Sequence, residues 1–504
     1  MKRSKFSLHH YKLATLEMGE LVPIGCYEVL PGDSIRQSSS MLMRLSPLVA
    51  PVMHPVQVRI HHFYVPARIL WDDFEDFITG GPDGMNSDNP PTLTSPGGGY
   101  AVGSLPDYLG IPPLKAGVVH SAMQIRAYNK VFNEIYRDQD LVAPVAEDSL
   151  VLQSCAWEKD YFTSARNSPQ KGPDITLPLG ISAPVWGNGK AIGLNDGSVT
   201  GFGLATNGTG ELIGASGNFE QNIGVATSGS SAAVSKGIGV VIAGSPEGSS
   251  GLIADLSDAT SVDVNDVRLA FALQRYQEAR QRYGSRYTEY LAYLGVRSSD
   301  ARLQRPEYLG GGKQTISFSE ILQTGPDAAD EGVGTLKGHG IAAVRTRPFV
   351  KFFEEHGYVI TIASVRPKSI YADGLHRQFY RPTKEDWWQR ELQEIGQQEI
   401  RKGELYAQGT SADYETWGYQ DRYRDYKEIP STISGQFRTT PMYTWHLARL
   451  FGSLPSLNGS FVTCDPSDRI YADQTSGAEH LWTMCNHRVT ARRLVTASPA
   501  SRIM

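Results

Sequence analysis

The sequence predicts a mainly β protein organised as an antiparallel β-sandwich. Three consecutive runs near the N-terminus, 20–33, 34–45 and 56–65, carry this prediction. In the second run, one face holds the apolar side chains and the other the polar ones: Ile35, Met41, Met43 and Leu45 against Arg36, Ser38, Ser40 and Arg44. Alternation of this kind, bounded by Pro and Gly, is typical of half-buried strands. No helical spacing separates the runs, so we expect them to form the first wall of the sandwich.

Further along the chain, four stretches have helical spacing: 71–78, 120–135, 266–283 and 385–406. In the first, four apolar side chains share a face and Gly80 follows as a stop signal. The stretch 266–283 places an apolar stripe opposite an arginine-rich face. Strand-like segments return at 315–318, 359–365 and 370–371, which indicates the second half of the sandwich.

Residues 180–251 differ in composition from the rest of the chain. They hold 18 of the 51 glycines and only six charged side chains. A segment of this kind cannot bury a conventional core alone, although copies gathered around a symmetry axis could cover its Val and Ile side chains. The alternative is a low-complexity linker.

We therefore predict one discontinuous domain over 1–504. Residues 180–251 form a Gly/Ser-rich surface insertion, 262–294 and 385–427 form helix-containing insertions, and 1–16 and 486–504 form basic termini.

The charge is concentrated at the two ends of the chain. The net charge is −5, yet residues 1–16 carry four Lys or Arg side chains and no acid, and residues 480–504 do the same with four arginines. Basic ends on an acidic body favour a contact between the termini and a polyanion. Solvated tails are the alternative interpretation.

Four cysteines at wide spacing form no disulfide framework and no CxxC motif, which favours a reducing compartment. The N-terminus lacks the apolar stretch of a signal peptide, and no apolar run is long enough to cross a bilayer. We expect a soluble protein that is made in the cytoplasm and does not insert into membranes.

Motifs for catalysis or cofactor binding are weak throughout. The sequence 311–314 (GGKQ) resembles a phosphate loop only until Gln314, where Ser or Thr is required. Cys464, His480, Cys485 and His487 match no common zinc spacing. We therefore expect no catalytic residue, no metal and no cofactor. Two other function classes remain open: a β-sandwich carbohydrate-active enzyme using Trp71, Trp387, Trp388 and Trp417 as sugar platforms, and a Gly-rich adhesin.

Several long motifs resemble the major capsid protein of microviruses, the small tailless icosahedral phages with single-stranded DNA, on their gokushovirus-like side. The most specific is 295–312 (GVRSSDARLQRPEYLGGG). The opening residues 20–33, 46–55 (SPLVAPVMHP) and 71–81 also match, and 418–427 (GYQDRYRDYK), 445–449 (WHLAR) and 457–462 (LNGSFV) continue the likeness. It covers most of the chain, in order, apart from 180–251.

The resemblance implies an eight-stranded jelly roll with long loop insertions, assembled in sixty copies as a T=1 shell around circular single-stranded DNA. It further implies a pilot protein, an internal scaffolding protein and a small DNA-binding protein as companions, and a variable insertion that faces the host receptor. The protein is then a structural subunit of the virion, assembled in the host cytoplasm, and not an enzyme.

Three groups of residues follow as candidates for these contacts. Interior DNA contacts are expected at Lys2, Arg3, Lys5, Arg488, Arg492 and Arg493. Contacts between subunits are expected in the aromatic and arginine-rich pieces, at Arg302, Arg305, Tyr308, Trp417, Tyr419, Arg422 and Tyr423. The host-facing loop is represented by Gly201, Gly208, Ser228 and Ser230.

Overall fold

A computed structural model describes residues 3–82, 85, 88–173, 175, 264–284, 286–296, 299–300, 304–322, 324, 334–475 and 477–496, with six short strands between 185 and 254. The chain divides into two compact units, Met1–Lys171 with Gln277–Met504, and Gly172–Tyr276. The predicted host-facing residues Gly201, Gly208, Ser228 and Ser230, and also Lys2 and Arg302, lie outside the described residues.

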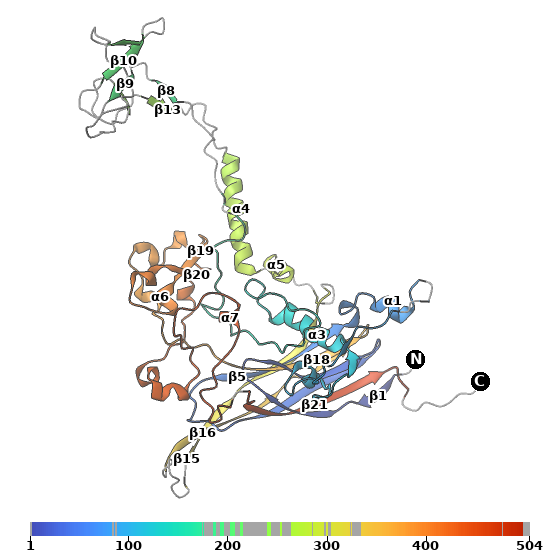
Figure 1. Cartoon of the computed structure of the whole chain (residues 1–504). Coiled ribbons are helices and arrows are strands. Elements are labelled where there is room, and N and C mark those ends of the chain that lie inside the picture. Colours follow the sequence, from blue (N-terminus) through green and yellow to red (C-terminus); the bar gives the residue numbers. More distant parts are fainter. Residues whose placement is uncertain are drawn as a thin grey trace, which may run out of the picture. The chain divides into compact units, whose positions relative to one another are not determined.

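Two antiparallel sheets face each other in the first unit (Figure 1). The larger has seven strands in the order β1-β21-β4-β16-β15, with β2 also on β21 and β17 also on β4. Its strands are β1 Ser4–Ser7, β2 His10–Leu16, β4 Ser34–Leu45, β15 Ser317–Leu322, β16 Leu336–Arg345, β17 Phe349–Phe352 and β21 Leu481–Arg493. The smaller has the order β14-β5-β18-β3, from Glu307–Thr315, Val56–Pro66, Gly357–Pro367 and Leu21–Val29.

The core lies between the two sheets. Met41 and Met43 of β4 are buried in one cluster with Val58 and Ile60 of β5, which confirms the alternation predicted for 34–45 and 56–65. The mainly β, antiparallel sandwich expected from the sequence is therefore present.

The sequence predicts that the first three strands form one wall of the sandwich, and this prediction is wrong. β3 and β5 flank β18 in the smaller sheet, whereas β4 lies between β21 and β16 in the larger one. The chain changes sheet twice, at the Pro31-Gly32 turn and at the proline-rich loop 46–55. Gly32 has φ 85°, a left-handed conformation that suits glycine.

Helices cover the outer face of the smaller sheet (Figure 1). Ile125, Tyr128 and Val131 of α3 Met123–Val131 are buried in one cluster with Phe63 and Ile360 of the sheet. The π-helical turn η2 Phe132–Tyr136 continues α3, and α2 Leu105–Leu109 joins the same layer. The helices predicted at 71–78 and 120–135 are thus confirmed, the first as α1 Phe74–Thr79. Short elements complete this region: η1 Ala67–Ile69, β6 Thr92–Thr94 and β7 Val119–Ser121.

The helix predicted over 385–406 is wrong. This region contains short 3-10 turns, the hairpin of β19 Gln397–Arg401 with β20 Thr416–Asp421, and a single helical turn, α6 Lys402–Leu405. Buried ion pairs, described below, override the helix propensity of its Glu, Gln and Arg residues. The other elements here are η3 Arg377–Phe379, η4 Lys384–Asp386, η5 Arg390–Leu392, η6 Ser411–Tyr414, η7 Arg424–Tyr426, η8 Gly435–Arg438, η9 Thr440–Trp445 and α7 Gly459–Val462.

In the second unit, the described strands form a four-stranded sheet, β11-β10-β9-β12, and a pair, β13-β8. Their bounds are β8 Val185–Gly187, β9 Ile192–Asn195, β10 Phe202–Thr206, β11 Leu212–Gly214, β12 Gly239–Ile242 and β13 Leu252–Ala254. The predicted helix at 266–283 is present as α4 Val264–Tyr283, and α5 Tyr287–Tyr293 follows it. Across the residues that are described, no helix combines the length and apolarity required to cross a bilayer.

Candidate nucleic-acid interface

The outer face of the larger sheet differs from that of the smaller sheet because no helix among the described residues covers it. Alternate side chains of its central strands are buried and exposed, as the pattern along β21 illustrates. The residues at 482, 484, 486, 488, 490 and 492 point away from the core, and pair in register with 44, 42, 40, 38, 36 and 34 of β4.

Half of this open face is basic. Its side chains come from four strands and occupy successive cross-strand rows: Lys5, Arg36, Arg345, Arg488 and Arg492, here called the basic zone. The serines at 34, 38 and 40 lie between them. Strands β1, β2, β4, β16, β17 and β21 contain no Asp or Glu. The basic zone therefore has no acidic neighbour on these strands.

One pair in the basic zone shows why an external anion is expected there. Lys5 of β1 lies directly opposite Arg492 of β21, and both side chains are exposed. Like charges at directly opposed positions destabilise a sheet. A bound polyanion would remove this repulsion.

The other half of the open face is mainly apolar, with the exposed Arg44 between Ile341 and Trp482. Its apolar side chains are Tyr11, Leu13, Leu42, Ile341, Trp482 and Met484, here called the apolar zone. Tyr11 and Leu13 are 69% and 77% exposed, and Trp482 is 49% exposed. A face that combines cations with aromatic side chains has the composition of a single-stranded nucleic acid site, where phosphates meet Lys and Arg and bases stack on rings.

The predicted DNA contacts divide into two groups. Lys5, Arg488 and Arg492 lie in the basic zone, and the Arg3 guanidinium lies 4.9 Å from the ring centroid of Phe352 on the edge of the same sheet. Arg493 has a different role, which corrects its assignment. It faces the core side, where its Nε lies 3.0 Å from Oδ2 of the fully buried Asp33 and its Nη2 donates to the carbonyl of Glu28. Successive side chains of a strand point to opposite faces, so Arg493 points to the core although its neighbour Arg492 is on the open face. Arg493 therefore forms a structural ion pair with Asp33.

The termini are therefore strands and not tails over their described lengths. β1 and β2 both pair with β21, which lies inside the larger sheet. Lys12, in β2, turns inward and donates to the carbonyls of Pro23 and Tyr108. Burial lowers the pKa of Lys12.

A polar layer crosses the core beneath the basic zone. Ser39 Oγ lies 2.8 Å from His487 Nδ1, and His62 Nδ1 lies 2.9 Å from Thr361 Oγ1. His487 Nε2 donates to the carbonyl of Ile24 at 3.0 Å. Burial, with a smaller contribution from neighbouring imidazoles, lowers the pKa of His62 to about 3 and that of His487 to about 4. Both rings are therefore neutral at pH 7.

Two of the predicted contacts between subunits, at Tyr423 and Trp417, make contacts within their own chain, and their role between subunits stays a prediction. Tyr423 is 3% exposed, and its hydroxyl lies 3.1 Å from the carbonyl of Trp387. Trp417 packs edge-on against Phe461 and donates from its indole nitrogen to the carbonyl of Pro455. The hydrogen-bonding group of each ring therefore has a partner in its own chain.

The remaining candidates of this group are more accessible. Tyr308 is 51% exposed, and Tyr419 and Arg422 are half-buried. Arg305 is ion-paired with Asp300, with Nη2 and Oδ1 2.5 Å apart. Their role in subunit contacts stays a prediction.

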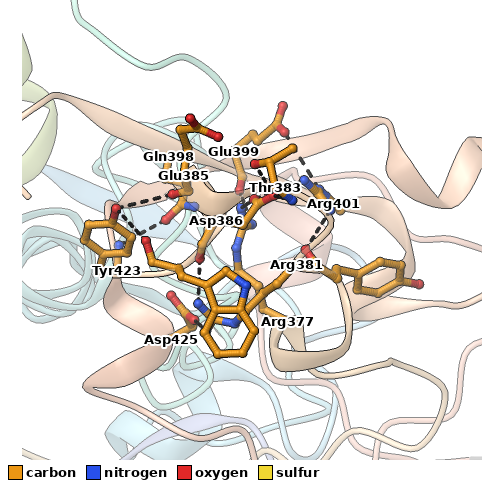
Figure 2. A network of polar contacts seen from close by, with 12 residues as sticks. Arg377, Arg381, Thr383, Glu385, Asp386, Gln398, Glu399, Arg401, Tyr423 and Asp425 are labelled. Carbon is orange, nitrogen blue, oxygen red and sulfur yellow. Dashed lines mark hydrogen bonds and ion pairs between the residues drawn. The ribbon is translucent and has the colours of Figure 1, made fainter. Parts of the chain in front are cut away.

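Buried ion pairs hold the region around β19 and β20 in place (Figure 2). Arg377 Nη1 lies 2.8 Å from Glu404 Oε1, and Arg401 Nη2 lies 3.3 Å from Asp386 Oδ1. Arg381 pairs with Asp425. These three arginines and three carboxylates are all largely buried and balance in charge, so the network leaves no net charge for a ligand, and loss of any one partner would leave an uncompensated buried charge.

Around this network, the surface carries a set of exposed rings, two of which, Trp387 and Trp388, are the sugar platforms of the carbohydrate-active alternative. These rings are Phe379, Trp387, Trp388, Tyr414 and Tyr426, here called the aromatic patch. The Arg381 guanidinium lies 4.3 Å from the ring centroid of Tyr426 and 5.6 Å from that of Trp387. Rigid aromatic side chains beside Arg are the composition of protein–protein interfaces.

The two histidines and two cysteines considered for a metal do not gather into one site. His480 instead lies with Glu17 and Asp468, whose ligand-type atoms are within 4.8 Å of one another. Its Nδ1 lies 2.8 Å from Glu17 Oε2 and its Nε2 lies 3.0 Å from the carbonyl of Asp473. Burial is the largest single influence on the pKa of His480 and lowers it, but the hydrogen bonds to Glu17 and the Asp473 carbonyl, together with the charges of Glu17 and Asp468, outweigh it and the net shift is upward. We interpret this group as an ion pair.

Arg36 and Arg345 belong to the basic zone but were not predicted as DNA contacts from the sequence. A signal was available for Arg36, because the polar face of the run 34–45 was predicted to point away from the core. Nothing in the sequence indicated that β16 pairs with β4 and brings Arg345 opposite Ser40.

Comparison with known proteins places this arrangement in context. The family model described as "Capsid protein (F protein)" matches residues 1–500. The chain is 36% identical over 483 residues to "Capsid protein VP1" of Bdellovibrio phage phiMH2K, covering 91% of this chain and 87% of the relative.

Two further relatives carry the same description. "Capsid protein VP1" of Chlamydia phage 1 is 34% identical over 548 residues, which cover 94% of this chain and 91% of the relative. That of Spiroplasma virus 4 is 31% identical over 496 residues, with 92% and 88% covered.

Proposed function

Because this chain belongs to the capsid protein (F protein) family, and is a structural capsid protein and not an enzyme, we propose that sixty copies assemble into a T=1 icosahedral shell around a circular single-stranded DNA genome. The subunit's place is then the virion, after assembly in the host cytoplasm.

We propose that the sandwich is an eight-stranded jelly roll. Four strands of the larger sheet, β2, β21, β4 and β16, would face β14, β5, β18 and β3, with β1, β15 and β17 as additions. The changes of sheet between β3, β4 and β5 support this topology, since consecutive jelly-roll strands alternate between the two sheets.

The observation that supports the DNA assignment best is the open face of the larger sheet, whose basic zone has no Asp or Glu on the strands that form it. The basic zone supplies phosphate contacts, and Trp482 and Tyr11 of the apolar zone supply rings on which bases can stack. Neither interaction reads sequence, which suits a shell that encloses a whole genome.

Contacts between subunits are assigned to the aromatic patch and to Tyr308. The buried arginine–carboxylate network fixes the backbone around the patch, so its rings lose little conformational entropy on binding. Closed shells need several such surfaces on each subunit, commonly about 2,000 Å² or more in obligate contacts.

The insertion 180–251 is assigned to host attachment, on its position and composition alone. A pilot protein, an internal scaffolding protein and a small DNA-binding protein complete the set of partners. A shortened chain lacking 190–245 should still form shells that no longer adsorb to the host; loss of shells would instead assign the segment a structural role.

Electron microscopy of the expressed full-length chain, alone and with a scaffolding partner, tests the proposed function. We expect uniform spheres of about 3.3 MDa, sixty times the 55.3 kDa of one chain. A chain that stays monomeric in both conditions would contradict it.

A further inference from the structure

Two cysteines that lie 309 positions apart in the sequence meet inside the first unit. Cys155 and Cys464 are 3% and 1% exposed, and both belong to the apolar cluster on the outer side of the smaller sheet. The other two cysteines lie elsewhere, Cys26 on β3 and Cys485 on β21. The function proposed above uses none of these thiols.

Backbone geometry places the pair face to face. Ala156 and Thr463 form an antiparallel bridge, flanked by hydrogen bonds from the Cys464 amide to the Cys155 carbonyl, at 2.8 Å, and from the Trp157 amide to the Val462 carbonyl, at 2.9 Å. Cys155 is therefore directly opposite Cys464. Side chains at opposed positions of an antiparallel pair lie on the same face, with Cα atoms about 5.5 Å apart. A disulfide spans Cα separations of about 4.4 to 6.8 Å.

The two thiols also affect each other's ionisation. Their mutual interaction is the largest cause that lowers the pKa of Cys155 and raises that of Cys464. The positive charge of Arg366 acts on both thiols, and this guanidinium is held in place by its bond to the carbonyl of Ala156 at 2.8 Å. A thiol beside a buried cation is the one that reacts as thiolate.

We propose that Cys155 and Cys464 are a redox pair that closes to an intrachain disulfide when the protein meets a small peroxide oxidant. The Cys155 thiolate attacks one oxygen of hydrogen peroxide, breaks the O–O bond and becomes a sulfenic acid, while the departing hydroxide takes a proton to become water. The sulfur of Cys464 then attacks the sulfenic sulfur, the S–S bond forms, and the hydroxyl leaves as a second water with the Cys464 proton. Two thiols and one peroxide thus give one disulfide and two waters.

The inference does not depend on shell formation, because all of its atoms lie in one chain. The disulfide would covalently join the segment around Cys155 to the C-terminal segment around Cys464. At this place the Cys155 amide also donates to the carbonyl of Gly19. Links that close long loops restrict the unfolded chain most.

The test uses the full-length wild-type chain, purified with its thiols reduced and then treated with hydrogen peroxide. After denaturation, alkylation should modify four cysteines before oxidation and two after it, Cys26 and Cys485. Tryptic digestion without reductant should give peptide 138–159 linked to peptide 450–469, and reductant should separate them. Oxidised glutathione, being bulky, should react far more slowly because both thiols are buried.

Variants supply the controls. Cys26→Ser should keep the linked peptide, and Cys155→Ala and Cys464→Ala should each lose it. Oxidation should raise the thermal unfolding midpoint of the wild type and of Cys26→Ser by about 3 to 6 °C, and leave that of Cys155→Ala unchanged. Four alkylated cysteines after peroxide treatment, a sulfinic acid at Cys155 without a link, or links only between chains would each overturn the proposal.

Discussion

The two sheets of the sandwich share a core but differ on their outer faces. The smaller sheet is covered by α2, α3 and η2, and β5 and β18 are buried on both sides over most of their length. The larger sheet has an open outer face, with cations in one half and apolar side chains in the other. An exposed face of this composition is not explained by the folding of one subunit. The smaller sheet therefore contributes both of its faces to the packing of the subunit, whereas the larger sheet leaves one face available for binding another molecule.

The largest expected effect is a difference in stability between variants of two neighbouring arginines of β21, which face opposite sides of the larger sheet. Arg493→Ala leaves the buried Asp33 carboxylate without its cation, and should lower the free energy of unfolding by about 3 kcal/mol or more. Arg492→Ala, its matched control on the open face, should change that energy by less than about 0.5 kcal/mol. Urea unfolding of the isolated subunit measures both, and equal losses would contradict the assignment of faces.

The next effect concerns DNA. Replacing Arg36, Arg345, Arg488 and Arg492 together with Gln should weaken binding of an oligo-dT strand about 100-fold near 0.1 M salt. The slope of log affinity against log salt should fall by about 3, since each lost phosphate contact removes about 0.7. Fluorescence anisotropy at several salt concentrations measures both values.

A matched control carries the same loss of charge on other surfaces of the chain. Replacing Lys313, Lys384, Arg390 and Lys427 with Gln removes four exposed cations outside the basic zone. If this control loses as much DNA affinity as the basic-zone variant, and its salt dependence falls by the same amount, binding responds to net charge alone and the basic zone is not the site.

A third prediction concerns the polar layer between the two sheets. The pKa of His62 is about 3 in the folded chain and about 6.5 when unfolded, so the unfolded chain binds more protons below pH 6.5. Stability should therefore fall as pH falls from about 6.5 toward 4, by about 1.4 kcal/mol per pH unit for each such histidine. His62→Gln should reduce the slope of the unfolding free energy against pH by about 1.4 kcal/mol per pH unit, which corresponds to one proton. His339→Gln, a control at an exposed histidine, should not reduce the slope in this way.

Urea unfolding of these two variants and the wild type between pH 7.5 and 4.5 provides the measurement. An identical pH slope in His62→Gln and the wild type would show that His62 does not titrate in this window.

The smallest effect uses the repulsion between Lys5 and Arg492. Lys5→Glu creates an opposite-charge pair across β1 and β21, and should stabilise the isolated subunit by about 0.5 kcal/mol while weakening DNA binding. Lys5→Gln separates the removal of repulsion from the new attraction. A Lys5→Glu subunit that is less stable than the wild type would show that the two side chains do not interact.

Part of this architecture could be predicted from the sequence, because β4 and β5 show clean alternation of apolar and polar residues. β21 alternates as well, but its buried positions hold Thr483, Cys485, His487 and Ala491, so its inner face does not read as apolar. The basic C-terminal end therefore shows no clear strand signal in the sequence, although residues 481–493 form a strand inside the larger sheet.

The candidate site could be predicted only in part for the same physical reason. Lys5, Arg488 and Arg492 follow from the local charge, whereas Arg345 and the aromatic patch depend on pairing between distant segments. The failed helix at 385–406 has the same origin. Its Arg401 and Glu404 find partners in the ion-pair network, and these contacts decide the local structure.

An icosahedral reconstruction of particles that contain the genome tests the central claim most directly. The account predicts that the larger sheet faces the particle interior, with nucleic acid density against Arg36, Arg488 and Arg492 and bases near Trp482. A particle in which this face points outward or is covered by a neighbouring subunit, with the nucleic acid elsewhere, would contradict it.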